Sequence, residues 1–85
     1  MMKKEIIFPF YLISRRAVTL AQKVQETTKR PFLIEKDERR VNAKSLLGLL
    51  SLGVKENDKV LLISDDEDAL IKVEKVIKNL QEGLL

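Results

Sequence analysis

Histidine, cysteine and tryptophan are absent from this chain of 85 residues. Without histidine, no imidazole can serve as a general base, a metal ligand or an acceptor of a phosphoryl group. Without cysteine, disulfides and thiolate metal sites are excluded, and a zinc site lacks its usual ligands. We therefore expect a protein with no metal and no cofactor, stabilised by one packed core, and we expect it not to be an enzyme. A carboxylate-based enzyme is the least favoured alternative.

Aromatic residues are scarce, at 5% of the chain, and the charge is uneven along it. Residues 1–44 carry 11 basic and 5 acidic side chains, whereas residues 45–85 carry 5 basic and 8 acidic ones. A basic half is one pattern of proteins that bind nucleic acid. However, no basic run is interleaved with the aromatic rings on which bases stack. The pattern favours two solvated faces without direct contact to nucleic acid, and a basic nucleic-acid-binding domain is a less favoured alternative.

Long hydrophobic runs are also missing. The apolar stretch at residues 6–13 is far too short to cross a membrane, and it contains Pro9. Glu5 precedes this stretch and no small-residue cleavage site follows it, so it lacks the pattern of a secretory signal. We expect a cytoplasmic protein without membrane contact, folded as a single domain over residues 1–85.

Hydrophobic periodicity divides the chain into seven expected elements. Short β-branched and aromatic runs predict four strands, at residues 4–8, 31–35, 40–42 and 59–64. Apolar positions at helical spacing predict three helices, at residues 15–28, 45–52 and 64–81. The order is β-α-β-β-α-β-α, and both long helices have one apolar face. This predicts an α+β protein, one antiparallel sheet with helices on a single face.

Cap signals accompany each expected helix. Ser14 is a plausible N-cap for the first helix and Ser45 for the second, because serine side chains accept hydrogen bonds from free N–H groups. Ser64 stands three residues before Glu67, the spacing of a capping box for the third helix. Gly53 is a natural stop just past the second helix.

The stretch VNAKSLLGLLSLGV, residues 41–54, places five leucines within seven positions. A helix that is hydrophobic nearly all round must be buried or must form a contact surface. One face of such a short helix cannot reach the sheet, so we expect some leucines to project into solvent, as at a binding site. Taken alone, the pattern gives Ser45 only a capping role.

The element order, the length and the stretch RRVNAKSLLGLLSLGV together resemble the HPr family, the histidine-containing phosphocarrier proteins of bacterial sugar transport. In that family a K-V-N-x-K-S sequence leads into a short helix. The matching positions are Val41, Asn42, Lys44, Ser45, Gly48, Ser51, Leu52 and Gly53. The resemblance implies the HPr-like open-faced sandwich, in which three helices cover one face of a four-stranded antiparallel sheet.

The chain departs from the family at its defining motif, G-[LI]-H-A-R-P-A, whose histidine carries the phosphoryl group. The matching residues here are YLISRRA, with Ile13 in the place of the histidine, Tyr11 in that of the glycine and Arg16 in that of the proline. The motif's arginine is kept as Arg15. Because isoleucine has no nucleophilic atom, the resemblance implies a degenerate phosphohistidine position, as in the histidine-less, Crh-like members.

The resemblance also implies a regulatory role. In the Gram-positive branch, the serine at the position of Ser45 is phosphorylated by an HPr kinase/phosphorylase, and the product binds a LacI-type transcription regulator in carbon catabolite repression. Carried over to this chain, the resemblance implies that Leu46, Leu47 and Leu50 are the exposed leucines of the helix, and that they and Arg15 are the partner-binding residues. The alternative is a docking decoy or scaffold for phosphotransferase-system proteins, without serine phosphorylation. A hinge such as FPFY, residues 8–11, is compatible with either a monomer or a domain-swapped dimer.

Overall fold

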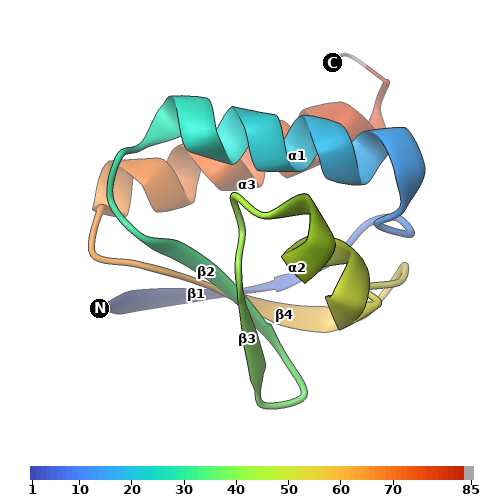
Figure 1. The fold of residues 1–85 in the computed structure, drawn as a ribbon, viewed down its shortest axis with the longest axis horizontal. Helices are drawn as coiled ribbons and strands as arrows, with labels where there is room; N and C mark the ends of the chain where they lie inside the picture. Colours follow the sequence, from blue (N-terminus) through green and yellow to red (C-terminus); the bar gives the residue numbers. More distant parts are fainter. Residues whose placement is uncertain (84–85) are drawn as a thin grey trace.

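The computed structural model describes residues 1–83 and contains the seven elements in the expected order (Figure 1). The strands are β1 (Met2–Ile7), β2 (Phe32–Lys36), β3 (Arg39–Asn42) and β4 (Lys59–Ser64). The helices are α1 (Ser14–Thr27), α2 (Leu46–Leu52) and α3 (Glu67–Gln81). All strand pairs are antiparallel, in the order β1-β4-β2-β3. The three helices lie on one side of this sheet (Figure 1), so the predicted architecture is confirmed.

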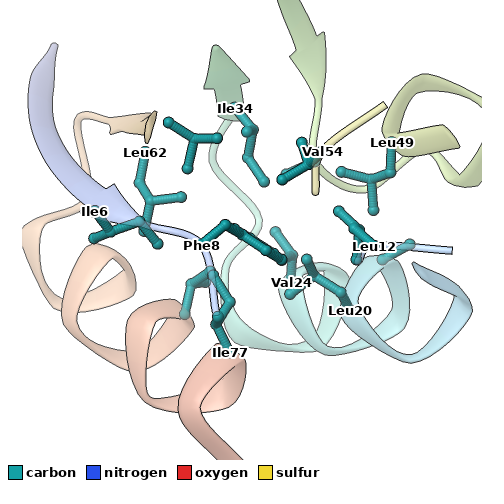
Figure 2. Packing of buried hydrophobic residues seen from close by; sticks show 14 of the residues in the cluster. Ile6, Phe8, Leu12, Leu20, Val24, Ile34, Leu49, Val54, Leu62 and Ile77 are labelled. Carbon is teal, nitrogen blue, oxygen red and sulfur yellow. The ribbon is translucent and has the colours of Figure 1, made fainter. Parts of the chain in front are cut away.

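The hydrophobic core lies between the helices and the sheet. Side chains alternate between the two faces of a strand, and the helix-facing residues of β2 and β4 are fully or almost fully buried: Phe32, Ile34, Val60 and Leu62. The predicted apolar faces of α1 and α3 are buried against them: Ala17, Leu20, Ala21, Val24, Leu70, Val73, Ile77 and Leu80. Figure 2 shows Phe8 in the middle of this core, between Leu62 and Ile77 on one side and Leu12 and Leu49 on the other.

Two of the predicted caps are wrong. Ser14 is the first residue of α1 rather than its N-cap, and its φ is +52°. The cap position belongs to Ile13, whose carbonyl accepts from the N–H of Ala17 at 3.4 Å, and no side chain caps this end. The segment before α1 is held by a contact distant in the sequence, because the N–H of Leu12 donates to the carbonyl of Val54 at 2.9 Å. This contact positions the residues that lead into the helix, so the local cap signal at Ser14 does not decide where the helix begins.

Ser64 does not form the predicted capping box. It ends β4 and is fully buried, and its hydroxyl donates to the carbonyl of Pro31 at 3.0 Å. The N-cap of α3 is Asp66, whose carboxylate accepts from the N–H of Ala69 at 3.1 Å. The hydroxyl of Ser64 accepts from the N–H of Asp66 at 3.1 Å, so it positions the cap instead of acting as one.

The turn between β2 and β3 consists of two residues with positive φ, Asp37 at +51° and Glu38 at +67°. A two-residue hairpin loop with both φ values positive matches the twist of antiparallel strands, and Asn-Gly or Asp-Gly is the preferred sequence. Glu38 therefore adopts a backbone conformation that costs a residue with a side chain about 1–2 kcal/mol.

Polar contacts close the end of the molecule where α3 begins. Arg30 donates to both carboxylate oxygens of Asp65, at 2.8 and 2.7 Å, and the Thr28 hydroxyl donates to Asp66 at 2.8 Å. The hydrogen bond from Arg30 lowers the pKa of Asp65, and the hydrogen bonds from Thr28 and the Ala69 N–H lower the pKa of Asp66. Both carboxylates therefore favour the folded state in their ionised form.

Candidate functional site

Helix α2 begins with a tightly bonded segment around Ser45. The Ser45 hydroxyl accepts from the N–H of Gly48 at 3.1 Å, so the predicted N-cap is confirmed. Its own N–H donates to the carbonyl of Asn42 at 3.0 Å, and the side chain of Asn42 accepts from the N–H of Lys44 at 2.9 Å. The serine is partly exposed at the surface. The local sequence thus holds the hydroxyl of a partly exposed serine in a fixed position at the start of the helix.

Gly48 allows α2 to lie close to β3. A Cβ atom at this position would stand 3.3 Å from the carbonyl oxygen of Asn42 and 3.3 Å from the Cβ of Val41, closer than most such contacts. At the other end of the helix, Gly53 adopts the left-handed conformation with φ +64°, as expected for a C-cap glycine. The close approach at Gly48 and the positive φ at Gly53 therefore explain why glycine suits both positions.

The five leucines of α2 separate into two faces. Leu49 and Leu52 are buried in the core. Leu47 is 79% exposed, and Leu46 and Leu50 are also exposed, so these are the three leucines that the resemblance predicted to face solvent. We call Leu46, Leu47 and Leu50 the leucine patch. Its exposure is observed, whereas its use by a partner stays a prediction.

The start of α1 carries the residues that match the degenerate motif. Ile13 is 43% exposed, and Arg15 and Arg16 are both exposed. The guanidinium of Arg16 lies over the ring of Phe10, 4.6 Å from its centroid, a cation–π contact that fixes the side chain. Within residues 1–83, neither arginine forms an ion pair with a carboxylate.

Helix α2, which carries the leucine patch, packs against α1. The bond from the Leu12 N–H to the Val54 carbonyl places the segment before α1 beside the chain just after α2. Ser45 lies at the opposite end of that helix, and seven residues at 1.5 Å each span roughly 10 Å. The structure thus packs the two helices that carry the predicted residues against each other, with Ser45 and the segment before α1 near opposite ends of α2.

Basic side chains from the β2–β3 hairpin hold the end of α2, and nothing in the sequence identified them. The Lys36 ammonium donates to the carbonyl of Gly53 at 2.7 Å, and Arg39 donates to that of Ser51 at 3.1 Å. Lys36 also pairs with Asp58 at 2.8 Å and lowers the pKa of that carboxylate. Cations at a helix C-terminus complement its dipole, but partners 12 to 17 residues apart are invisible to local patterns.

A family model described as "PTS HPr component phosphorylation site" matches residues 5–82. The HPr-like protein Crh of Bacillus subtilis is 39% identical over 80 residues, which cover 94% of this chain and 93% of the relative. The chain belongs to the HPr family. A solved structure of HPr-C-His from Thermoanaerobacter tengcongensis superposes with a TM-score of 0.77 at 29% identity, covering 99% of this chain and 94% of that one.

A second solved relative is Crh itself, described as the Bacillus subtilis catabolite repression containing protein. It superposes with a TM-score of 0.71 at 33% identity and covers 93% of each chain, and it is described as an intertwined dimer with a swapped domain.

Membership of the HPr family settles the class of protein. HPr proteins carry phosphate or regulate and are not catalysts, so this chain is not an enzyme. The absence of histidine means that it cannot carry phosphohistidine. In the part of the chain that the structure describes, no carboxylate cluster is arranged to hold a metal ion. No described helix is both long enough and apolar enough to span a membrane.

Proposed function

We propose that this HPr-family chain is a non-catalytic regulator of the carbon catabolite repression type, phosphorylated on Ser45 in the cytoplasm. Its modifying enzyme would be an HPr kinase/phosphorylase, and its phosphorylated form would bind a LacI-type transcription regulator. The observation that carries this proposal is the placement of a partly exposed serine, whose hydroxyl is held by a hydrogen bond, next to three exposed leucines.

The position of Ser45 suits a phosphate that must not disturb the fold. A phosphoserine adds close to two negative charges and three strong acceptor oxygens. The N–H of Gly48, which donates to the hydroxyl at 3.1 Å, would face this charge. The domain would keep its packing, because Ser45 lies outside the buried cluster. Phosphorylation would therefore add a docking feature without changing the fold.

The leucine patch would supply the second part of the binding energy. Burial of an exposed leucine against a partner would contribute about 25 cal/mol of binding free energy per Å² of apolar surface removed from water. Arg15, exposed at the start of α1, would pair with an acidic group on the partner. Binding would then require both the phosphate and the apolar contact, which gives a switch rather than a permanent complex.

The test is phosphorylation of the purified chain by an HPr kinase/phosphorylase with ATP, followed by intact mass and peptide mapping. We expect one added phosphate on Ser45, none on Ser45→Ala, and unchanged uptake by Ser51→Ala. Ser51 is a matched control, because it is an exposed serine of the same helix with its hydroxyl bonded to a carbonyl, at 2.8 Å from Gly48 O. Phosphate on any other residue would contradict the proposal.

Binding of the modified protein to a LacI-type regulator completes the test. Leu47→Ala should weaken the phosphorylated complex, while Ser45→Ala should abolish regulated binding and cost about 1 kcal/mol of folding free energy, as for loss of a cap. Equal binding by phosphorylated and unphosphorylated protein would contradict the switch.

A second candidate is a docking decoy or scaffold for proteins of the phosphotransferase system. The observation that favours it is the exposure of Ile13, at 43%, beside an arginine free of carboxylate partners within residues 1–83. Binding to the first enzyme of that system in the absence of Ser45 phosphorylation, and its loss in Arg15→Ala, would support this role.

Domain swapping, as described for Crh, is proposed for this chain as well, as the alternative to a monomer. The segment after β1 contains Pro9, and in the closed form its neighbour Phe8 exchanges two backbone hydrogen bonds with residues 57 and 58. Slow interconversion of monomer and dimer after dilution, altered in Pro9→Ala, would support the exchange of β1.

A further inference from the structure

Exposed apolar side chains also occur on β1 and α3, away from the leucine patch. Ile7 of β1 is 57% exposed and Ile71 of α3 is 60% exposed. β1 is an edge strand, so one side of its backbone has no partner among the described strands, and α2 packs near β3 at the other edge. In Figure 1, β1 lies at the back of the molecule and α2 at the front. This edge is therefore separate from the surface of the proposed function.

The side chains of β1 alternate between the two faces of the sheet. Ile6 is buried in the core, and Lys4 reaches Glu74 of α3 at 3.4 Å, so even-numbered positions face the helices. Lys3 and Glu5 therefore project from the open face, where the Glu5 carboxylate lies 3.8 Å from the Lys59 ammonium.

A groove of about 190 Å³ runs between β1 and α3. The apolar residues Ile6, Ile7, Pro9 and Ile77 line it, together with Glu74, Lys78 and Gln81. A strand that added to β1 would therefore find both unpaired backbone groups and an apolar hollow beside them.

We propose that β1 pairs with the β1 of a second copy of this chain, antiparallel and about a two-fold axis through Lys4. Residues directly opposite one another in an antiparallel pair share a face of the sheet, so odd positions must oppose odd positions. With the axis at Lys4, Lys3 of each copy lies opposite Glu5 of the other, which gives two ion pairs on the open face. Met2 lies opposite Ile6 of the other copy on the helix face, next to the groove.

This register is the one that the charges favour. An axis at Glu5 would place two carboxylates opposite each other, each with Lys59 of its own chain at 3.8 Å, and would leave both lysines opposite isoleucines, so it would gain no ion pair across the strands. An axis at Lys4 places its two ammonium groups together, but each has Glu74 of its own chain at 3.4 Å. Opposite charges across strands stabilise pairing and like charges destabilise it, so the sequence MKKEII is complementary to itself in this one arrangement.

The same charges explain why the strand that pairs with β1 comes from a second copy of this chain and not from an unrelated protein. Lysines on an edge strand discourage pairing with unrelated strands. A strand is accepted only where it offers a carboxylate opposite Lys3 and a basic group opposite Glu5, and β1 itself meets both conditions. This contact does not depend on the phosphorylation of Ser45.

The proposed contact is distinct from domain swapping. A swapped dimer exchanges β1 but rebuilds the same β1–β4 pairs, from Met2 opposite Ser64 to Ile7 opposite Lys59. Such a dimer contains no contact between Lys3 of one copy and Glu5 of the other. Charge reversal on β1 therefore separates the two kinds of dimer.

The experiment is sedimentation equilibrium of the full chain, with K3E, E5K, the double variant and K29E as a matched charge-reversal control. Lys29 is exposed in the connection between α1 and β2, away from the edge. Each single variant should weaken dimerisation about tenfold or more, since two attractive pairs become repulsive, and the double variant should recover it. Far-UV circular dichroism checks that each variant is folded, and K29E should dimerise as the original does.

A mixture of K3E and E5K gives the sharpest readout. One strand then carries two carboxylates and the other two ammonium groups at the facing positions, so heterodimers should form in excess over either homodimer. A chain that stays monomeric at millimolar concentration would overturn the proposal. A dimer whose dissociation constant is unchanged by K3E and by E5K would also overturn it, and would indicate domain swapping instead.

Discussion

Two neighbouring leucines of α2 provide a direct test of how this helix divides its apolar side chains. Leu49 is fully buried, while Leu47 is 79% exposed, although both lie in the same seven-residue helix. We expect Leu49→Ala to reduce the free energy of unfolding by about 2–5 kcal/mol, the usual range for a buried leucine. We expect Leu47→Ala to change it by no more than about 0.5 kcal/mol, as at other surface positions.

The expected difference is large compared with the stability of so small a protein. At 0.05–0.15 kcal/mol per residue, a chain of 85 residues is stable by roughly 4–13 kcal/mol. Leu49→Ala therefore removes a large share of the total, and it should lower the melting temperature by at least about 8 °C at 4–8 °C per kcal/mol.

Urea denaturation followed by far-UV circular dichroism is the assay, because the chain has no tryptophan to report by fluorescence. Binding by phosphorylated Leu47→Ala is measured in parallel, since weaker binding at unchanged stability is what a contact residue shows. If Leu47→Ala costs more than about 1.5 kcal/mol, or Leu49→Ala less than about 1 kcal/mol, the assignment of the two faces is wrong.

The β2–β3 hairpin turn, the Arg30–Asp65 ion pair and the degenerate motif before α1 each give a further prediction. Glu38→Gly should raise the free energy of unfolding by about 0.5–1 kcal/mol, measured by urea denaturation, because its φ of +67° suits glycine. The pKa of Asp65 is lowered by the hydrogen bond from Arg30, so the stabilisation is present above the ordinary carboxyl pKa of about 3.9 and is lost as the pH falls through the lower folded value. Melting temperatures should therefore drop below about pH 4, and less steeply in Arg30→Gln; an equal slope in both would contradict this. With phosphoenolpyruvate and the first enzyme of the transport system, the chain should take up no acid-labile phosphate, since Ile13 stands at the histidine position.

The sequence alone determined the order of elements and the chemistry that is excluded. Periodicity places one apolar face on each long helix, because burial of that face is what stabilises it, and the buried residues of α1 and α3 are those predicted. The caps at Ser45 and Gly53 were also predictable, since each depends on residues within one turn of its own helix. The absence of histidine excludes phosphohistidine whatever the fold, because no other side chain of the chain carries an imidazole.

The tertiary structure decided what depends on segments distant in the chain. Ser14 and Ser64 have the local pattern of caps, yet the first follows an entry fixed by Val54 and the second is bonded to Pro31. Which leucines of α2 face solvent depends on how this helix packs against α1 and β3. The position of β1 at the sheet edge is likewise a property of strand order, which no local pattern encodes. At these positions, contacts with remote segments decide the structure over the local sequence pattern. The reason is that a buried polar group needs a hydrogen-bond partner, and the fold can supply that partner from a distant part of the chain.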